Sequence, residues 1–338
     1  GELPSRVVDN LFWLGRYAER AESSARLLRT TMQLISSEDG DMPAIPALVR
    51  ALADSGQIEP GYAIAELTSS LPQLESMLPE AVFDIKLPRS LRSTINEAVR
   101  LASIVRDRLA LDAWRILHKL DHTARRPKQK FALDATDVLE VLDSILTDLV
   151  AFAGLAGESM TRTQSWRFLD LGRRLERAYQ TSSALRAMLT EVQLAEDDSP
   201  VLEAALLTQD SLMTYRSRYL ANMQLPAALD LLITDDTNPR SIIFQLARIV
   251  EHIDNLPRDA NQAQLGPEQR LALALYNGVR LADVSDLIEA DSSLQRVKLD
   301  RLLRRIGDQL PKLSDVVSSR FLIHAGLARH FGSRTMGL

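Results

Sequence analysis

The sequence of 338 residues contains no cysteine, and this absence excludes several chemistries at once. Disulfide bonds, thiolate metal sites and a cysteine nucleophile are all ruled out. An apolar run long enough to span a bilayer is also missing, and no signal-peptide pattern opens the chain. We therefore expect a cytoplasmic protein with no membrane partner.

Lysine is scarce, and the charge balance is negative. Only 6 of the 40 basic residues are lysines, which leaves 34 arginines (40 − 6), and the formal net charge is −5. A negative chain has no general attraction to nucleic acid, so we expect no nucleic-acid partner. A GC-rich genome favours arginine, but arginine also binds carboxylates and phosphates in a planar, bidentate geometry that lysine lacks.

The common nucleotide and nucleophile motifs are missing as well. The chain has no GxxxxGK[ST] phosphate loop, no GxGxxG after a strand and no GxSxG elbow. His118 and His122 are four residues apart but form no HExxH pattern, so we expect no metal site. We therefore expect this chain to hold no cofactor of its own and to carry out no ATP-hydrolysing or dinucleotide-dependent reaction.

What the sequence does contain is helical periodicity. Apolar residues recur at helix spacing over long stretches, and 14 glycines and 14 prolines gather in the gaps between them. Runs that alternate apolar and polar residues are missing, so the pattern predicts an all-α protein. Short helices are expected through about residue 86, and longer helices at about 4–36, 89–120, 133–153, 158–191, 200–218, 225–234, 239–255, 267–289 and 293–323.

One polar motif occurs twice. Residues 14–28 read LGRYAERAESSARLL and residues 171–185 read LGRRLERAYQTSSAL, so the frame LGRxxERA repeats after 157 positions. A weaker parallel joins LPRSLRSTINEAVRLASIVRDRL (87–109) to NPRSIIFQLARIVEHIDNL (238–256). We predict a single domain over 1–338, a helical bundle built from two pseudo-two-fold-related halves at about 4–155 and 156–330.

The polar residues of the motif lie opposite the apolar stripe of each predicted helix. Arg16, Glu19 and Arg20 share their side with Phe12 and Trp13. In the second copy, Arg173, Glu176 and Arg177 share theirs with Leu169 and Trp166. Large apolar side chains beside charged ones indicate a helix that is covered on both sides.

A covered arginine must be paired, and the spacing suggests the pairs Arg16–Glu19 and Arg173–Glu176. Gly15 and Gly172 cost each helix about 1 kcal/mol relative to alanine, and the gain would be close approach of another backbone or of a ligand. Two interpretations stay open: ordinary surface ion pairs, or a buried network at the pseudo-two-fold axis. Such a network either locks the halves together or presents guanidinium groups to an anion in a central cleft.

Two further stretches extend the candidate site. Glu158 and Trp166 flank Arg162 at helix spacing, on the charged side of the second motif helix. In TDDTNPRS, Asn238 is expected to cap a helix whose early Arg240 points at an anion or at Asp235 or Asp236; the other interpretation, a simple capped loop, stays open. The predicted anion or carboxylate site comprises Arg16, Glu19, Arg20, Arg162, Arg173, Glu176, Arg177, Arg216 and Arg240, supported by Trp13, Gly15, Glu158, Trp166, Gly172 and Asp236.

NLFWLGRYAERAE, the second LGRxxERA, TYRSRY (214–219) and DDTNPRS (235–241) together resemble the Alpha-E family, an all-helical domain named for its glutamate–arginine motif. The likeness covers nearly the whole chain. It implies a partnership with a circularly permuted ATP-grasp protein, encoded nearby or fused ahead of the helical domain, and often with a transglutaminase-like protein. ATP and Mg²⁺ would then bind only to the ATP-grasp part. The opening GELPSRV fits a domain excised from the C-terminal part of such a fusion.

The resemblance implies an accessory or substrate-positioning domain in ATP-dependent amide or peptide bond formation. In this role the cleft arginines would hold a carboxylate-bearing peptide. Two alternatives belong to other classes. The domain is either a structural scaffold that docks the ligase, or an independent peptide-modifying transferase or hydrolase that uses Glu19 or Glu176 as a general base. The resemblance assigns no catalytic residue.

Overall fold

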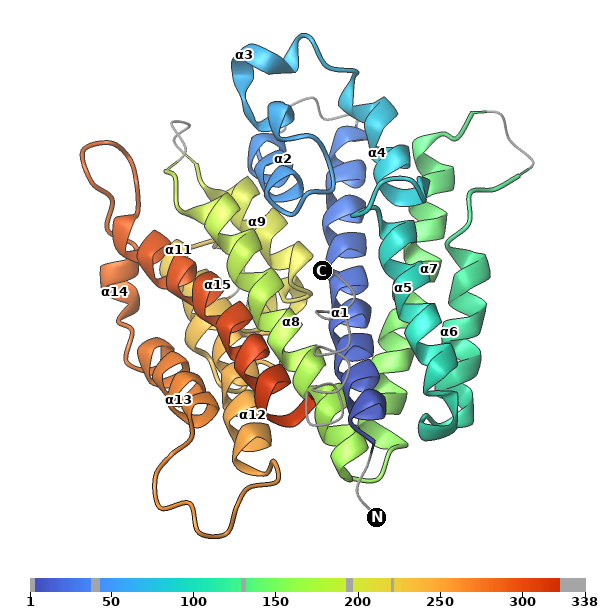
Figure 1. Ribbon diagram of the computed structural model, residues 1–338. Helices are drawn as coiled ribbons and strands as arrows, with labels where there is room; N and C mark the ends of the chain where they lie inside the picture. Colours follow the sequence, from blue (N-terminus) through green and yellow to red (C-terminus); the bar gives the residue numbers. More distant parts are fainter. Residues whose placement is uncertain (1–3, 38–42, 129–131, 193–196, 220–221, 323–338) are drawn as a thin grey trace, which may run out of the picture.

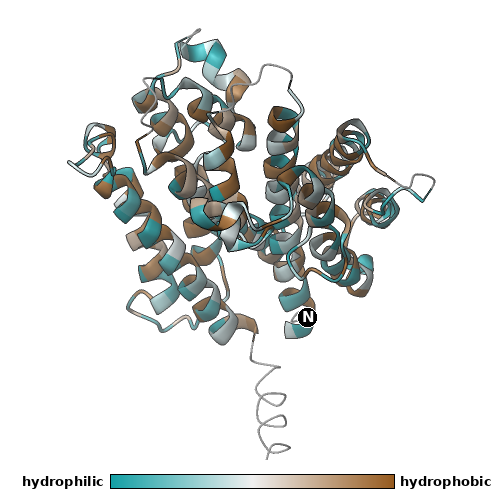
Figure 2. Cartoon of the chain, turned by 90° about the horizontal axis from the view of Figure 1, so that it is seen from above, coloured by the Kyte–Doolittle hydropathy of each residue, from teal (hydrophilic) through white to brown (hydrophobic). Residues whose placement is uncertain are grey.

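The computed structural model describes residues 4–37, 43–128, 132–192, 197–219 and 222–322. These residues form fifteen α-helices and no strand, which confirms the all-α prediction. Gly1–Leu3, which begin the stretch that suggested a domain excised from a fusion protein, lie outside the described residues. None of the described helices is both long and apolar enough to cross a membrane. Accordingly, no helix in Figure 2 is hydrophobic along its whole length.

Two long helices, α1 (Ser5–Ile35) and α8 (Gln164–Leu189), lie side by side in the middle of the molecule (Figure 1). Of their residues, 18 of 31 in α1 and 17 of 26 in α8 are buried, so each helix is covered around most of its circumference. This burial confirms that the charged side of each motif helix is covered.

The other helices flank this central pair. On one side α1 packs against α5 (Leu91–Ile104) and α7 (Ala135–Glu158), and α6 (Leu111–Thr123) lies on both of these. On the other side α8 packs against α12 (Ile242–Asp254) and α15 (Val297–Val317), and α13 (Pro267–Arg280) lies on both. The two sides therefore follow the same order of contacts, as two related halves would, although the pseudo-two-fold relation between complete halves stays a prediction.

Shorter elements complete the fold. The remaining α-helices are α2 (Ile45–Asp54), α3 (Ala65–Thr68), α4 (Leu74–Phe83), α9 (Ser199–Thr208), α10 (Leu212–Tyr219), α11 (Leu225–Leu229) and α14 (Val284–Leu287). Single turns of 3₁₀-helix lie at η1 (Pro60–Ala63) and η2 (Arg106–Arg108), and turns of π-helix at η3 (Asp230–Thr234) and η4 (Ser318–Leu322).

Three helices that were predicted to be continuous are each observed as two separate helices. The helix expected at 89–120 is split between α5 and α6 by the turn η2. The helix expected at 200–218 is split between α9 and α10, where Asp210 adopts a left-handed conformation with φ 52°. The helix expected at 267–289 ends at Arg280 and is followed by the separate short α14.

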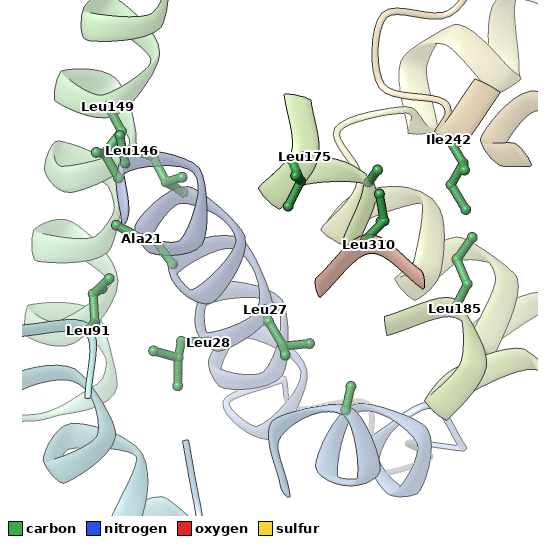
Figure 3. Close-up of a cluster of buried hydrophobic side chains, with 14 of the residues drawn as sticks. Ala21, Leu27, Leu28, Leu91, Leu146, Leu149, Leu175, Leu185, Ile242 and Leu310 are labelled. Atoms are coloured by element: carbon green, nitrogen blue, oxygen red, sulfur yellow. The ribbon is translucent and has the colours of Figure 1, made fainter. Parts of the chain in front are cut away.

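The apolar core continues across the central pair. Figure 3 shows Ala21 of α1 beside Leu146 and Leu149 of α7, while Leu175 of α8 faces Leu310 of α15. All of these side chains are buried. Because α1 and α8 have apolar neighbours on their outer sides, their polar motif residues are left to face each other at the centre.

Candidate functional site

The two motif glycines bring the backbones of α1 and α8 into direct contact. A Cβ atom on Gly15 would lie 2.2 Å from the carbonyl oxygen of Leu169, and one on Gly172 would lie 2.0 Å from that of Phe12. The contact is reciprocal, because Leu169 and Gly172 stand 157 positions after Phe12 and Gly15. The predicted close approach is confirmed, and the group that approaches is the other helix backbone.

The motif carboxylates pair across this contact and not within their own helix. Arg20 donates to Glu176 with an Nε–Oε1 distance of 2.8 Å, and Arg16 Nη2 lies 3.5 Å from Glu176 Oε2. In the opposite direction, Arg177 donates to both oxygens of Glu19 at 2.9 and 3.0 Å, and Arg173 Nε donates to Oε1 at 3.2 Å. The predicted pairs Arg16–Glu19 and Arg173–Glu176 are therefore wrong. Each glutamate binds the arginines of the other copy.

Aromatic rings and a hydroxyl supplement these crossed pairs. Arg16 also donates to Ser314 Oγ of α15 at 3.0 Å, and its guanidinium lies 4.6 Å from the ring centroid of Trp13. The Arg20 guanidinium lies 4.7 Å from the ring of Tyr17. Arg16 is 8% exposed and Glu176 is fully buried, so the pairs lie inside the protein. The interpretation as ordinary surface ion pairs is excluded.

A second buried carboxylate, Glu22, extends the network along α1. Arg240 Nη1 donates to Glu22 Oε2 at 2.7 Å, and Arg177 and Arg26 lie 3.7 and 3.6 Å from it. Arg240 and Arg26 also reach Asp210 at 3.2 and 3.5 Å. Burial acts to raise the pKa of Glu22, but Arg240, Arg177 and Arg26 outweigh it and hold the pKa well below its usual range.

A third buried carboxylate, Asp170, lies at the other end of the network. It accepts hydrogen bonds from Arg173 at 2.9 Å, Arg174 at 3.3 Å and His252 Nε2 at 2.6 Å. Because Arg167 donates to the other ring nitrogen of His252 at 3.0 Å, the proton of a neutral ring belongs on Nε2. Burial acts to raise the pKa of Asp170, but the effect of His252 and the two arginines is larger and holds the pKa well below its usual range. Burial also lowers the pKa of Arg174, to about 10.

The motif network itself is closed. The cavity beside Glu19, Glu22, Arg177 and Arg240, which we call the Arg240 pocket, has a volume of about 20 Å³. A cavity of this size holds one water molecule at most. The arginines of the repeated motif therefore converge on the glutamates of the opposite helix and do not open into a ligand cleft there.

A larger cavity of about 320 Å³, the Arg89 pocket, lies on the other side of Gln180, which lines both cavities. Its lining is polar and comes from α1, the turn after α2, the start of α5, and α8: Tyr17, Arg20, Ser24, Ser55, Gln57, Pro88, Arg89, Ser93, Thr94, Glu97 and Gln180. This volume is at the lower end of the range for small-molecule sites. Arg20 is thus the only residue of the predicted site that lines it.

The predicted extension through Glu158, Arg162 and Trp166 is not one helical face. Glu158 is the last residue of α7 and α8 begins at Gln164, so Arg162 lies in the connection. Arg162 donates to the carbonyl oxygen of Gly157 at 2.6 Å and stacks 4.2 Å from the ring of Trp166. It therefore binds the carbonyl end of α7, and both Glu158 and Arg162 are exposed.

The predicted site around Arg240 is also divided. Arg216 is exposed and pairs with Glu203 at 3.2 Å, Arg218 pairs with Asp235, and the exposed Asp236 lies 3.9 Å from Arg280. None of these residues joins Arg240, which is held by Glu22 and Asp210. The helix cap is Ser241, whose Oγ accepts a hydrogen bond from the backbone of Phe244, and not Asn238.

Sequence reasoning missed several residues that matter here. Glu22 follows Glu19 by nearly one helical turn, a signal that could have placed it in the network. Arg89 stands in LPRS, at the place that Arg240 holds in NPRS, so the parallel already indicated it. Gln57 and Asp210 carry no comparable signal, because each lies in a turn after a short helix.

The fold and this site define a class of protein: an all-helical chain in which two central helices each carry an arginine–glutamate motif and pair it with the other copy. The chain belongs to the Alpha-E family, described as a predicted alpha-helical domain with a conserved ER motif, and the match covers residues 3–322.

Curated relatives include uncharacterized proteins of Mycobacterium tuberculosis (strain H37Rv) and Mycobacterium bovis, each 28% identical over 336 residues. The alignment covers 95% of this chain but 37% of each relative, so the chain spans just over a third of their length. No solved structure matches.

Proposed function

We propose that this chain is an accessory domain that positions a carboxylate-bearing substrate for a circularly permuted ATP-grasp ligase during amide or peptide bond formation. The ligase partnership comes from the Alpha-E resemblance. The relatives' extra length leaves room for a further domain in those proteins. The observation that carries the positioning role is the polar Arg89 pocket of about 320 Å³, which lies beside the central helix pair.

The motif network serves this role by holding the walls of the pocket in place. Arg20 lines the pocket and is anchored on Glu176, so the register of α1 and α8 determines where its guanidinium lies. A positioning site needs side chains that are locked by a surrounding shell of contacts. The network therefore acts as a scaffold, while the pocket provides the binding surface.

The geometry gives less support to an independent enzyme. A general base must come within hydrogen-bond reach of its substrate. Glu176 is fully buried between Arg16 and Arg20, and Glu19 lines only the Arg240 pocket of about 20 Å³. Neither carboxylate lines the larger pocket.

The proposal is tested with the ATP-grasp protein that accompanies this chain, by measuring ADP release with a carboxylate substrate and an amine. We expect ADP release to depend on this chain. The double variant Arg16→Lys with Arg173→Lys should lower the melting temperature, because lysine cannot reproduce the guanidinium geometry. An ATP-grasp protein that neither binds the chain nor responds to it would refute the proposed function.

A further inference from the structure

The Arg89 pocket and the Arg240 pocket occupy matching places on the two central helices. Arg20 and Ser24 line the first, and the residues 157 positions later, Arg177 and Thr181, line the second. Arg89 and Arg240 match as well, because each directly precedes a serine N-cap, Ser90 of α5 or Ser241 of α12. The Arg240 pocket therefore shows how an arginine that directly precedes a serine N-cap is neutralised in this protein.

The turns that border the two pockets also match. Gly56, after α2, has φ 75°, and Asp210, after α9, has φ 52°. The next residue in each turn donates its backbone N–H to a carbonyl five positions back, Gln57 to Leu52 at 3.0 Å and Ser211 to Leu206 at 2.9 Å. Gly56 thus stands where the other side has Asp210.

The pockets differ in their carboxylates. Arg240 is bound by Glu22 at 2.7 Å and by Asp210 at 3.2 Å. The matching positions on the other side are Tyr179, 157 residues after Glu22, and Gly56, so both carboxylates are missing. Arg89 makes no hydrogen bond or ion pair with any residue that the structure describes. The Arg89 pocket has a volume of about 320 Å³, whereas the Arg240 pocket has about 20 Å³.

The glycine at position 56 also leaves room for the side chain of Arg89. A Cβ atom there would lie 3.0 Å from Cδ of Arg89, so the arginine stem passes directly over the glycine backbone. The Arg89 charge is therefore held at the pocket wall with no carboxylate of the described chain to balance it.

One buried polar atom beside the pocket also lacks a partner. Gln57 is 6% exposed, and its Oε1 accepts no hydrogen bond. Ser24 is equally buried and lines the pocket. Because less than 1 Å² of Gln57 Oε1 is accessible, the guanidinium of Arg89 is the unpaired group that a ligand in the pocket meets. Glu97 is already paired with Arg100 and leaves the Arg89 charge unbalanced.

We infer that the Arg89 pocket binds the terminal carboxylate of a peptide or amino acid, with the carboxylate on Arg89. The ligand takes the place that Glu22 and Asp210 hold in the matching pocket. The inferred ligand is the substrate class of the positioning role proposed above, and its cellular role rests on that proposed function. The binding itself needs no ligase.

The test is calorimetry on the full chain without the ligase, with alanylalanine, its C-terminal amide and inorganic phosphate as probes. We expect alanylalanine to bind at millimolar concentration or below, and the amide at least about tenfold more weakly, because it lacks the charged acceptor. No binding of alanylalanine, equal binding of acid and amide, or preference for phosphate would each overturn the inference.

A matched pair of variants tests the missing carboxylate directly. Gly56→Asp restores the residue found at position 210, in a left-handed conformation that aspartate tolerates. It should weaken alanylalanine binding by about tenfold or more, because the new carboxylate neutralises Arg89. Gly56→Asn is equal in size but neutral and crowds Arg89 in the same way, so it should bind alanylalanine at least about tenfold more tightly than Gly56→Asp does. Equal affinity of the two variants would contradict the inference.

Arg89→Ala provides a variant whose folding is not in question, because Arg89 is exposed and unpaired. Binding should weaken by about tenfold or more. Arg108→Ala removes an equally exposed charge outside the pocket and should leave binding unchanged.

If alanylalanine binds through Arg89 but ligation does not depend on the chain, the proposed function fails and the carboxylate site stands. If ligation depends on the chain but no carboxylate binds, only the site fails.

Discussion

At the scale of single residues, the crossed pairs place an unusual demand on two glutamates. Glu19 and Glu176 each bind two arginines of the opposite helix, and both carboxylates are buried. A buried ion pair adds little net stability when intact, because desolvation offsets the attraction. Removing one partner is far more costly, because it leaves the other charge buried and unpaired.

Glu176→Gln should therefore destabilise the protein by about 3–5 kcal/mol, because Arg16 and Arg20 lose their shared carboxylate. Denaturation in urea, followed by circular dichroism, measures this change. The control is Glu203→Gln, which breaks an exposed pair with Arg216 and should cost no more than about 1 kcal/mol. A similar loss in both variants would show that the buried network has no special energetic role.

At the scale of the helices, the two glycines set the distance between α1 and α8. Any side chain at position 15 or 172 would overlap a carbonyl oxygen of the other helix, and a backbone cannot rotate away as a side chain can. The helices would have to separate, and the separation would lengthen the crossed ion pairs. The close contact and the paired charges therefore depend on each other.

Gly15→Ala and Gly172→Ala should each destabilise the protein by at least about 2 kcal/mol through overpacking. Gly154→Ala in α7 and Gly307→Ala in α15 are matched controls, because no atom lies within 4 Å of the added Cβ. These controls should stabilise the protein by up to about 1 kcal/mol through helix propensity. Thermal unfolding of the four variants distinguishes the two effects, and a motif glycine that behaves like the controls would contradict the close contact.

Periodicity was enough to predict the central helices. The expected helix at about 4–36 is observed as Ser5–Ile35, because an apolar stripe of this length has one consistent phase. The break at Asp210 could not be predicted, since its left-handed conformation accompanies contacts with Arg26 and Arg240, which are distant in sequence.

The candidate site was predictable in part for the same reason. A helical wheel shows which side of α1 carries Arg16 and Glu19, but not what lies opposite. Spacing alone therefore favoured the local pair, whereas the partner of each glutamate depends on how closely the two helices approach.

At the scale of the whole molecule, a layer of charge lies inside a shell of apolar helices. The network joins α1, α8, the segment before α12 and the turn after α9 through seven arginines and five carboxylates: Arg16, Arg20, Arg26, Arg173, Arg174, Arg177 and Arg240 with Glu19, Glu22, Asp170, Glu176 and Asp210. The surplus of two positive charges (7 − 5) favours anions in its surroundings, including the adjacent Arg89 pocket.

This interior charge should make the protein sensitive to acid. Glu22 and Asp170 have folded-state pKa values below their usual 4.5 and 3.8. As the pH falls past those usual values, the unfolded chain takes up protons that the folded protein does not, so unfolding is favoured. The stabilisation is fully present above about pH 5 and is lost progressively as the pH falls toward the folded values.

Glu22→Gln should be less stable than the natural sequence near neutral pH, and the difference should shrink as the pH falls below about 4. Urea midpoints measured from neutral to acid pH provide the comparison. An unchanged difference across that range would mean that Glu22 titrates alike in the folded and unfolded chain.

α1 and α8 each give the other a glycine, two arginines and a glutamate, and each receives the same set in return. Two identical helices with this motif would therefore be self-complementary, like the subunits of a two-fold homodimer. Joining two such units in one chain keeps this interface inside a single molecule. Loss of either glutamate therefore leaves arginines of the other copy without their carboxylate.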